Sequence, residues 1–404
     1  MSSEELSRSL SLPMVTLYGM GTILGAGIYV LIGEVAGVAG AWAPLAFLVA
    51  AVLAGFSAFA YAELSSRYPK SAGEAVYLQE GIGWRWLSML VGLMVASVGI
   101  LSSATIAKGF VGYLHVFVQV PEPLVTSMLV VILGLIAWWG IRESVLVIGL
   151  FTLIEVFGLL LIIWVGWDSI DRLPSLWSDT RSTGGEGYLT GVLLGAFLAF
   201  YAFIGFEDMV NVAEEVKHAR RTLPLAIILV LVLTTLLYIV VALVAVLAVP
   251  AAELSGKEAP LAYIYELNTG RSPVVITLIG MFAVVNGALI QIIMASRILY
   301  GMSRQGWLPA TISRVHPATQ TPHIATLMVT LAILAFALLL PLLTLANITS
   351  LITLLIFSFI NLALIRIKLR DARPAGVIVY PLWIPVAGLI ANLTFISYQF
   401  YERI

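Results

Sequence analysis

The sequence contains no cysteine and little charge. Asp, Glu, Lys and Arg make up 11% of its 404 residues, whereas a soluble domain carries about 25% charged residues. The absence of cysteine excludes disulfides, thiol catalysis and thiolate metal sites. The few histidines are scattered without metal-ligand spacing, so we expect no metal site and no cofactor. The net charge of −1 gives no indication of a nucleic-acid partner.

Hydrophobic residues make up 61% of the chain, with a mean hydropathy of +1.04. A helix that crosses a bilayer needs about 20 mainly apolar residues. The pattern predicts an all-α polytopic membrane protein that forms one transport domain over 1–404, with the lipid bilayer as its surroundings. We expect eleven spans, at 13–39, 42–64, 84–117, 123–141, 144–166, 188–211, 223–249, 273–303, 322–341, 344–367 and 376–400. The polar start lacks the features of a cleaved signal peptide.

Lys and Arg are unevenly divided between the two sets of connections. If the N-terminus is cytoplasmic, fifteen of them lie inside and five outside, with Lys108 within the third span. The positive-inside rule therefore predicts a multi-pass protein of the cell membrane with a cytoplasmic N-terminus. Lys108 is expected to extend its ammonium group to the outer interface. The oligomeric state stays open.

Glycines interrupt the first and the sixth predicted span. The stretch "TILGAGIYVLIG" places Gly25 and Gly27 in the first, and "AFYAFIGFEDMV" places Gly205 in the sixth. Gly costs about 1 kcal/mol relative to Ala inside a helix. The two interruptions lie five spans apart, so their helices run in opposite directions. This pattern is typical of an inverted repeat with broken helices at corresponding positions.

The repeat divides the chain into a first half, 13–166, and an inverted second half, 188–367, followed by an additional helix, 376–400. Backbone groups that a break frees must line a cavity. The freed amides begin a half-helix, whose N-terminus favours an anion such as a carboxylate. The freed carbonyls of the sixth span suit an ammonium group. Together they would select an α-amino acid.

Four stretches together resemble the amino acid–polyamine–organocation superfamily of secondary transporters. They are "GAGIYVLIG" (25–33), "AYAELSSRYPKSAGEAVYL" (60–78), "FYAFIGFED" (200–208) and "ASRILYGMSRQGWLP" (295–309). The resemblance implies the leucine-transporter-like fold of five plus five helices, with helices 1 and 6 broken. Its members commonly have twelve spans, and this chain lacks the last.

The resemblance also implies a substrate site. The substrate carboxylate is expected at the backbone of Gly25, Ala26, Gly27 and Ile28. The amino group is expected at the carbonyls of Tyr201, Ala202 and Ile204. The ring of Tyr201 matches a position that shields the substrate from the outside in relatives, which implies a gate.

Glu155 lies near the middle of the fifth span. A carboxylate there costs roughly 2.5–3.5 kcal/mol on insertion scales. It should face the bundle and could gain and lose a proton as the cavity opens to each side. Some proton-coupled relatives carry a lysine at about this position. A structural hydrogen bond and cation binding remain alternatives for Glu155.

Other polar residues allow two interpretations. Asn286 and Gln291 either face the first helix or join helices by hydrogen bonds. Glu207 and Asp208 follow the second break, where acids cap a half-helix or attract a cationic group. Glu63, Arg67 and Glu74 of the 60–78 stretch are expected to lie at the inner surface and to form an ion-pair network.

We therefore expect a secondary active transporter of small or hydrophobic neutral L-amino acids, coupled to H⁺ through Glu155. The alternatives are a polyamine or cationic amino acid carrier or exchanger, and a Na⁺-coupled symporter. The sequence contains none of the usual hydrolase motifs, so we expect no enzyme activity. A channel would use symmetric rings of carbonyls or charges, and two antiparallel broken helices favour a transporter.

Overall fold

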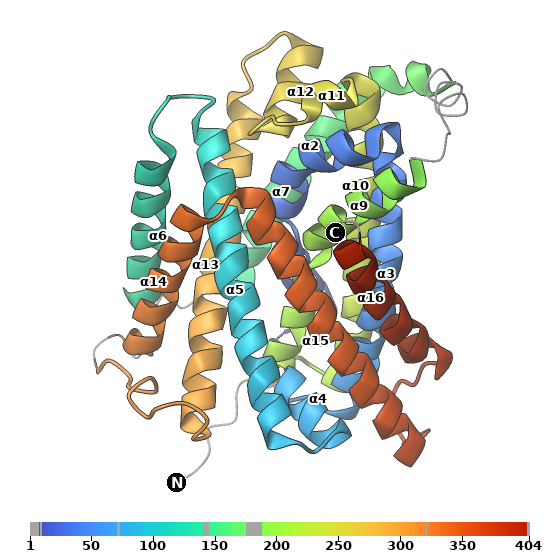
Figure 1. Ribbon diagram of the computed structural model, residues 1–404, viewed down its shortest axis with the longest axis vertical. Coiled ribbons are helices and arrows are strands. Elements are labelled where there is room, and N and C mark those ends of the chain that lie inside the picture. Colours follow the sequence, from blue (N-terminus) through green and yellow to red (C-terminus); the bar gives the residue numbers. More distant parts are fainter. Residues whose placement is uncertain are drawn as a thin grey trace.

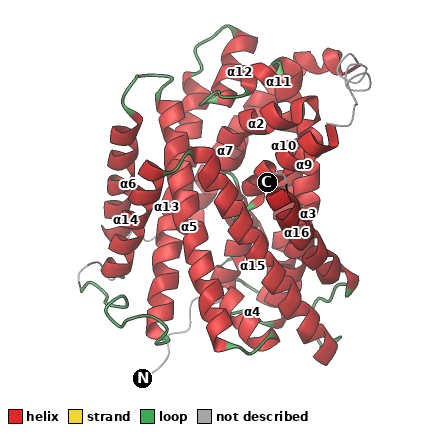
Figure 2. Ribbon diagram, in the orientation of Figure 1, coloured by secondary structure: helices red, strands yellow, loops and turns green. Residues whose placement is uncertain are grey.

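The computed structural model describes residues 8, 10–70, 73–139, 145–174, 188–317, 319 and 321–401. Parts of the predicted fourth and fifth spans (140–141 and 144) and most of the loop before the sixth span lie outside these residues. The regular elements of the described part are helices, which Figure 2 shows as a bundle. Nine helical stretches in it are long and apolar enough to cross a membrane, and α1 and α14 are shorter apolar helices.

The first repeat contains five membrane-crossing units, of which the first is broken into two helices. In chain order they are α1 Leu12–Ile23 with α2 Ala26–Ala39, then α3 Ala43–Arg67, α5 Arg85–Leu114, α6 Glu122–Trp139 and α7 Val145–Gly166. Short helices connect or follow them: η1 Gly40–Trp42, α4 Gly73–Gly81 and η2 Trp167–Arg172. These bounds agree with the predicted spans to within three residues wherever both ends are described.

The second repeat has the same organisation. Its units are α9 Tyr188–Phe200 with η3 Tyr201–Phe203 and η4 Phe206–Glu215, then α10 Ala219–Ala248, α13 Val274–Arg304, α14 His323–Leu339 and α15 Leu342–Arg370. The short helices α11 Ala251–Leu254 and α12 Pro260–Thr269 lie between α10 and α13, at the top of Figure 1, and α4 lies at the bottom. The last helix is α16, Trp383–Tyr401.

Corresponding helices of the two repeats pack against each other. The second units, α3 and α10, are in contact, as are the third units, α5 and α13, and the fourth units, α6 and α14. In the first units, α2 packs against α9. Contacts between counterparts are expected when the two halves are related by an axis that passes between them. The eleven units and this pairing confirm the predicted all-α inverted-repeat fold.

The last helix begins later than the sequence predicts, at Trp383 instead of 376. The segment before it is extended and bound to α3. The Tyr380 amide donates to Glu63 Oε2 at 2.9 Å, and the Ile378 amide donates to Ser66 Oγ at 3.0 Å. Pro381 follows, and the residue before a proline is biased away from helix. The apolar character of 376–382 therefore reflects packing on α3 and not a helical span.

The ion-pair network near the end of α3 differs from the expected one. Glu63 is fully buried and accepts from both Arg67, at 2.7 Å, and Lys368, at 2.8 Å. Glu74 is not part of it, because its Oε1 accepts from the Tyr61 hydroxyl at 3.3 Å. Lys368, on α15, is far from the 60–78 stretch in sequence, so the motif alone could not indicate it. At the other end of the bundle, Lys108 forms an ion pair with Glu122 of α6.

Candidate substrate site between two helix breaks

The two helix breaks are built alike, with an extended residue followed by a glycine at positive φ, although the ψ angles of the two glycines differ, −139° at Gly25 and −21° at Gly205. Leu24 is extended, with φ −66° and ψ 141°, and Gly25 follows with φ +149°. In the sixth unit Ile204 is extended, with φ −68° and ψ 134°, and Gly205 follows with φ +127°. A positive φ favours glycine, which lacks a Cβ. Each break is therefore an apolar residue and a glycine, at equivalent places in the two repeats.

The two breaks lie in direct contact. A Cβ atom at Gly27 would be 2.4 Å from the Cα of Ala202, and one at Gly205 would be 2.3 Å from the carbonyl oxygen of Thr22. The Thr22 hydroxyl donates to the Gly205 carbonyl at 2.9 Å. Only glycines allow the two backbones to approach this closely.

Free amides begin the second half of the first unit. The Tyr29 amide makes the first turn's hydrogen bond, to the Gly25 carbonyl at 3.1 Å. The amides that precede it have no partner inside the helix and carry the positive end of its dipole. Tyrosine hydroxyls bind the backbone on both sides of the break. That of Tyr238 donates to the Ile23 carbonyl at 3.2 Å, and that of Tyr113 donates to the Tyr29 carbonyl at 2.7 Å.

A cavity of about 30 Å³ lies between the breaks. The first break, η3, α5 and α13 line it, with Thr22, Ile23, Leu24, Gly25, Gly27, Ser102, Ile106, Tyr201, Ile204, Gly287, Ile290 and Gln291. This space holds only about one or two water molecules. The conformation is therefore contracted at this point, and the breaks must separate to admit an amino acid.

The structure brings most of the predicted site residues together. Gly25, Gly27, Tyr201 and Ile204 line the cavity. Ala202, in the second repeat, packs directly against Gly27 of the first. Ile28 is fully buried and does not line the cavity. Ala26 begins α2, and its side chain lies outside the described set.

Of the three carbonyls expected to bind an ammonium group, that of Tyr201 already accepts the Ile204 amide, at 3.2 Å. A carbonyl has two lone pairs, so one remains. The Tyr201 hydroxyl donates to the Ser102 carbonyl of α5 at 3.4 Å. This ties the aromatic side chain to the third helix beside the cavity.

Glu155 is buried, 1% exposed, and lies beside the first break without lining the cavity. Its Oε1 accepts from Asn286 Nδ2 of α13 at 3.5 Å, and its Oε2 has no partner among the described residues. The Tyr29 hydroxyl donates to the Glu155 backbone carbonyl at 2.5 Å. Glu155 therefore connects α7, α13 and the helix whose N-terminus faces the cavity.

A second, smaller chamber of about 10 Å³ adjoins the cavity and shares Ile204 and Gln291 with it. Three buried acids line this chamber: Glu74, Glu207 and Asp208. Glu207 Oε2 accepts the Gly205 amide at 2.9 Å, as a capping residue would, and Asp208 Oδ2 accepts from Gln291 Nε2 at 3.3 Å. The sequence indicated the cap but placed Glu74 at the surface. Burial raises the pKa of the Glu74 carboxyl from 4.5 to about 7.

A vestibule of about 290 Å³ continues from this chamber to the end of α13. It shares Glu74, Val95, Asp208 and Met294 with the chamber, and reaches Gln305 and Trp307 at its mouth. The vestibule, the chamber and the cavity therefore form a sequence of adjoining spaces from one side of the bundle to the breaks.

Sequence reasoning missed several residues of this site. Ser102 and Ile106 come from α5, and Gly287 comes from α13. The hydroxyl-rich run "SSAT" at 102–105 was the available signal, because hydroxyls in a membrane helix face protein more often than lipid. The sequence marks Gln291 as a polar residue within a span but does not place it between the cavity and the chamber.

Comparison with known proteins agrees with this geometry. The profile of the family described as Amino acid permease matches residues 10–402. The chain belongs to the amino acid permease family. The family and its curated members are membrane transporters and not enzymes, so this permease is a membrane transporter too.

Two curated relatives cover most of the permease. It is 28% identical over 392 residues to the branched-chain amino acid permease BcaP of Bacillus subtilis (strain 168), covering 91% of this chain and 82% of the relative. It is 31% identical over 405 residues to the cationic amino acid transporter 3, mitochondrial, of Arabidopsis thaliana, covering 90% of this chain. The permease spans 63% of that plant protein's length.

One solved structure has the same fold. The crystal structure of MhsT in complex with L-phenylalanine matches with a TM-score of 0.66 at 16% identity, covering 96% of the permease and 98% of MhsT. At this identity the likeness shows the fold alone. The family and the fold thus agree with the resemblance seen in the sequence motifs.

Proposed function

We propose that this permease is a secondary active transporter that moves small or hydrophobic neutral amino acids by alternating access, coupled to protons. The observation that carries the proposal is the cavity enclosed by two matching helix breaks, Leu24–Gly25 and Ile204–Gly205. Such discontinuous helices hold substrates near the bilayer midplane in transporters with inverted repeats.

The two ends of an amino acid match the two breaks. The free amides before Tyr29 would bind the carboxylate, since they carry the positive end of the α2 dipole. The remaining lone pairs of the Tyr201, Ala202 and Ile204 carbonyls would accept from the ammonium group. The side chain would then face α5 and α13, where Ile106, Ile290 and Gly287 offer apolar surface and space. This lining favours a neutral side chain.

Proton coupling would pass through Glu155. The backbone of this residue holds the Tyr29 hydroxyl, and its Oε1 accepts from Asn286. Movement of α2 on substrate binding would therefore change the surroundings of the carboxyl group. The protonated carboxyl group of Glu155 is neutral and needs no counter-charge in the membrane. A proton bound there would therefore cross with the substrate.

A cationic amino acid is the second candidate substrate, and one observation favours it. The chamber next to the cavity is lined by Glu74, Glu207 and Asp208, and no Lys or Arg of the described residues forms an ion pair with them. A long cationic side chain that extends past Gln291 would meet these acids. One curated relative is a branched-chain permease and another a cationic amino acid transporter, so both substrate classes are to be tested.

We also propose that the N-terminus lies in the cytoplasm of a cell whose plasma membrane holds the permease. The excess of Lys and Arg in one set of connections supports this orientation. The vestibule would then open to the cytoplasm, because it ends at Trp307, just after α13.

The deciding experiment combines binding and transport. The purified permease is screened by thermal shift against neutral and cationic amino acids and polyamines, because a ligand that binds only the folded state raises the unfolding temperature. Uptake of each hit is then measured in proteoliposomes under an imposed pH gradient, a Na⁺ gradient, or neither. Leucine-like ligands driven by the pH gradient support the proposal. Preference for lysine or arginine selects the cationic candidate, and Na⁺-driven uptake contradicts proton coupling.

A further inference from the structure

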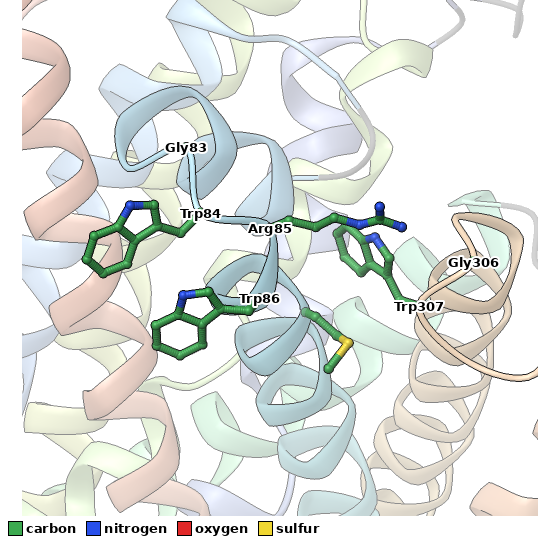
Figure 3. A pocket seen from close by; sticks show the side chains of 7 residues that line it. Gly83, Trp84, Arg85, Trp86, Gly306 and Trp307 are labelled. Carbon is green, nitrogen blue, oxygen red and sulfur yellow. The ribbon is translucent and has the colours of Figure 1, made fainter.

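A surface pocket of about 740 Å³ lies beside the mouth of the vestibule. Its lining comes from the turn before α5, the start of α5 and the loop after α13, and includes Trp84, Arg85, Trp86, Gly306 and Trp307. Figure 3 shows Arg85 directed toward Trp307, while Trp84 and Trp86 project from the opposite side of the helix. The substrate pathway described above does not use this pocket.

The pocket lies at the level of lipid headgroups. The helices α5 and α13 contain 30 and 31 residues, so each is about 45 Å long at 1.5 Å per residue. The hydrocarbon core is only about 30 Å thick, and about 40–45 Å with the headgroup regions. The start of α5 and the end of α13 therefore reach the layer of phosphates.

The aromatic side chains fit this layer. Trp84 and Trp86 are 55% and 59% exposed, and their rings stack with centroids 6.0 Å apart. Exposed tryptophans gather at the boundary between membrane and water because an indole is apolar and also donates a hydrogen bond. The pair therefore faces lipid and holds the start of α5 at the interface.

Arg85 brings an uncompensated positive charge to the pocket. Its Nη2 donates to the Gln305 carbonyl at 3.3 Å, and no carboxylate of the described residues forms an ion pair with it. It stands at the first position of α5, where no acid is present in the first turn and Trp84 provides no side-chain cap. An arginine there adds to the positive end of the helix dipole. An anion in the pocket would compensate the charge of Arg85 and the positive end of the α5 dipole.

We propose that this pocket binds the headgroup of an anionic phospholipid. The guanidinium of Arg85 would hold the phosphate in a two-pronged contact, and Trp307 would pack against the glycerol and the start of the acyl chains. Trp307 lines both this pocket and the vestibule. A bound lipid would therefore fix one wall of the vestibule mouth, at a loop whose Gly306 has φ +71°.

The test measures lipid binding directly, so that it is independent of the transported substrate. Purified permease is titrated with phosphatidylglycerol or phosphatidylcholine, and the bound lipid is counted by native mass spectrometry. Arg85→Gln should weaken phosphatidylglycerol binding roughly tenfold, the effect expected from loss of a charge-assisted contact. Arg314→Gln is the matched control, since it removes the same charge from an exposed residue beyond α13. It should leave the affinity within about twofold.

Two further arms keep the result decisive if Arg85→Gln is unstable. Arg85→Lys keeps the positive charge but loses the planar guanidinium that makes the bidentate contact. Trp307→Leu leaves Arg85 in place but removes the aromatic ring. Each variant should weaken phosphatidylglycerol binding. Equal losses in Arg85→Gln and Arg314→Gln would overturn the proposal, since they would indicate attraction to overall charge. Competition by inorganic phosphate at the same concentration as the lipid would also overturn it, because the pocket would then be a site for free anions.

Discussion

Gly27 of α2 lies against the backbone of Ala202, with only 2.4 Å between the Cα of Ala202 and the place a Cβ of Gly27 would take. The two residues belong to opposite repeats and stand beside the central cavity. We predict that Gly27→Ala forces the breaks apart and reduces transport at least tenfold, because a backbone neighbour cannot move aside as a flexible side chain can. Uptake into proteoliposomes measures the loss.

The matched control for this change is Gly55→Ala. Gly55 lies in α3 and lines neither the cavity nor the vestibule, and a Cβ there would make only an ordinary contact, 3.6 Å from a side-chain carbon of Leu231. This variant should transport at the wild-type rate. Thermal unfolding in detergent should show that both variants are folded. Normal uptake by folded Gly27→Ala would contradict the assignment of the breaks as the substrate site.

Glu155 allows a test of proton coupling. We predict that wild-type uptake rises as the pH on the entry side falls, and that Glu155→Gln removes this dependence. An amide resembles the protonated carboxyl in shape and can keep the contact with Asn286, but it cannot release a proton. The measurement is initial uptake rate against pH, with substrate in excess.

Glu253→Gln serves as the control, because Glu253 lies on the short helix α11, outside the membrane-crossing units. It should keep the wild-type pH profile. If Glu155→Gln keeps that profile as well, the carboxyl is a structural hydrogen-bonding group and the coupling site lies elsewhere.

The sequence predicted the helices and both breaks, because apolar length and glycine position are local properties. It could not predict which distant side chains meet at the breaks. Lys368 reaches Glu63 across the α3–α15 contact, and Tyr238 reaches the Ile23 carbonyl from α10. Neither residue has a local pattern that distinguishes it. Glu74 was misplaced for the same reason, since only the packing of α4 against α5 and α15 buries it.

Tyr201 is the predicted gate. Its hydroxyl contacts the Ser102 carbonyl, and its side chain is 5% exposed. We predict that Tyr201→Ala lets outside solvent reach the cavity, whereas Tyr201→Phe, which loses only a hydrogen bond of about 1 kcal/mol, does not. The chain has no cysteine, so Ile106→Cys on the cavity wall gives a single reporter for a membrane-impermeant thiol reagent.

Labelling of this reporter from outside should be faster in Tyr201→Ala than in the parent, and unchanged in Tyr201→Phe. A cysteine at Val118, which is 48% exposed between α5 and α6, controls for reagent access and should label equally in all backgrounds. Equal labelling of Ile106→Cys with and without the Tyr201 ring would show that another group closes the outer side.

Glu74 predicts a pH effect on stability. Burial raises the pKa of its carboxyl from 4.5 to about 7, so the folded permease binds this proton more tightly than the unfolded chain does. The free energy of unfolding therefore falls as the pH rises from about 4.5 to about 7, by roughly 3 kcal/mol for this one group. Glu74→Gln is always neutral and should avoid this fall. We expect it to unfold at a higher temperature than the wild type at pH 8 and at a similar temperature at pH 5.

Other acids also titrate over this range, so the informative quantity is the difference between variants at each pH. Glu80→Gln is the control, because Glu80 is exposed on the same helix, α4. Its unfolding temperature should follow that of the wild type at both pH values. A Glu74→Gln variant that is less stable than the wild type at pH 8 would mean that the folded permease stabilises the ionised carboxylate of Glu74, which contradicts a raised pKa. A cation, such as the side chain of a basic substrate, would then be needed in the chamber that Glu74 shares with Glu207 and Asp208.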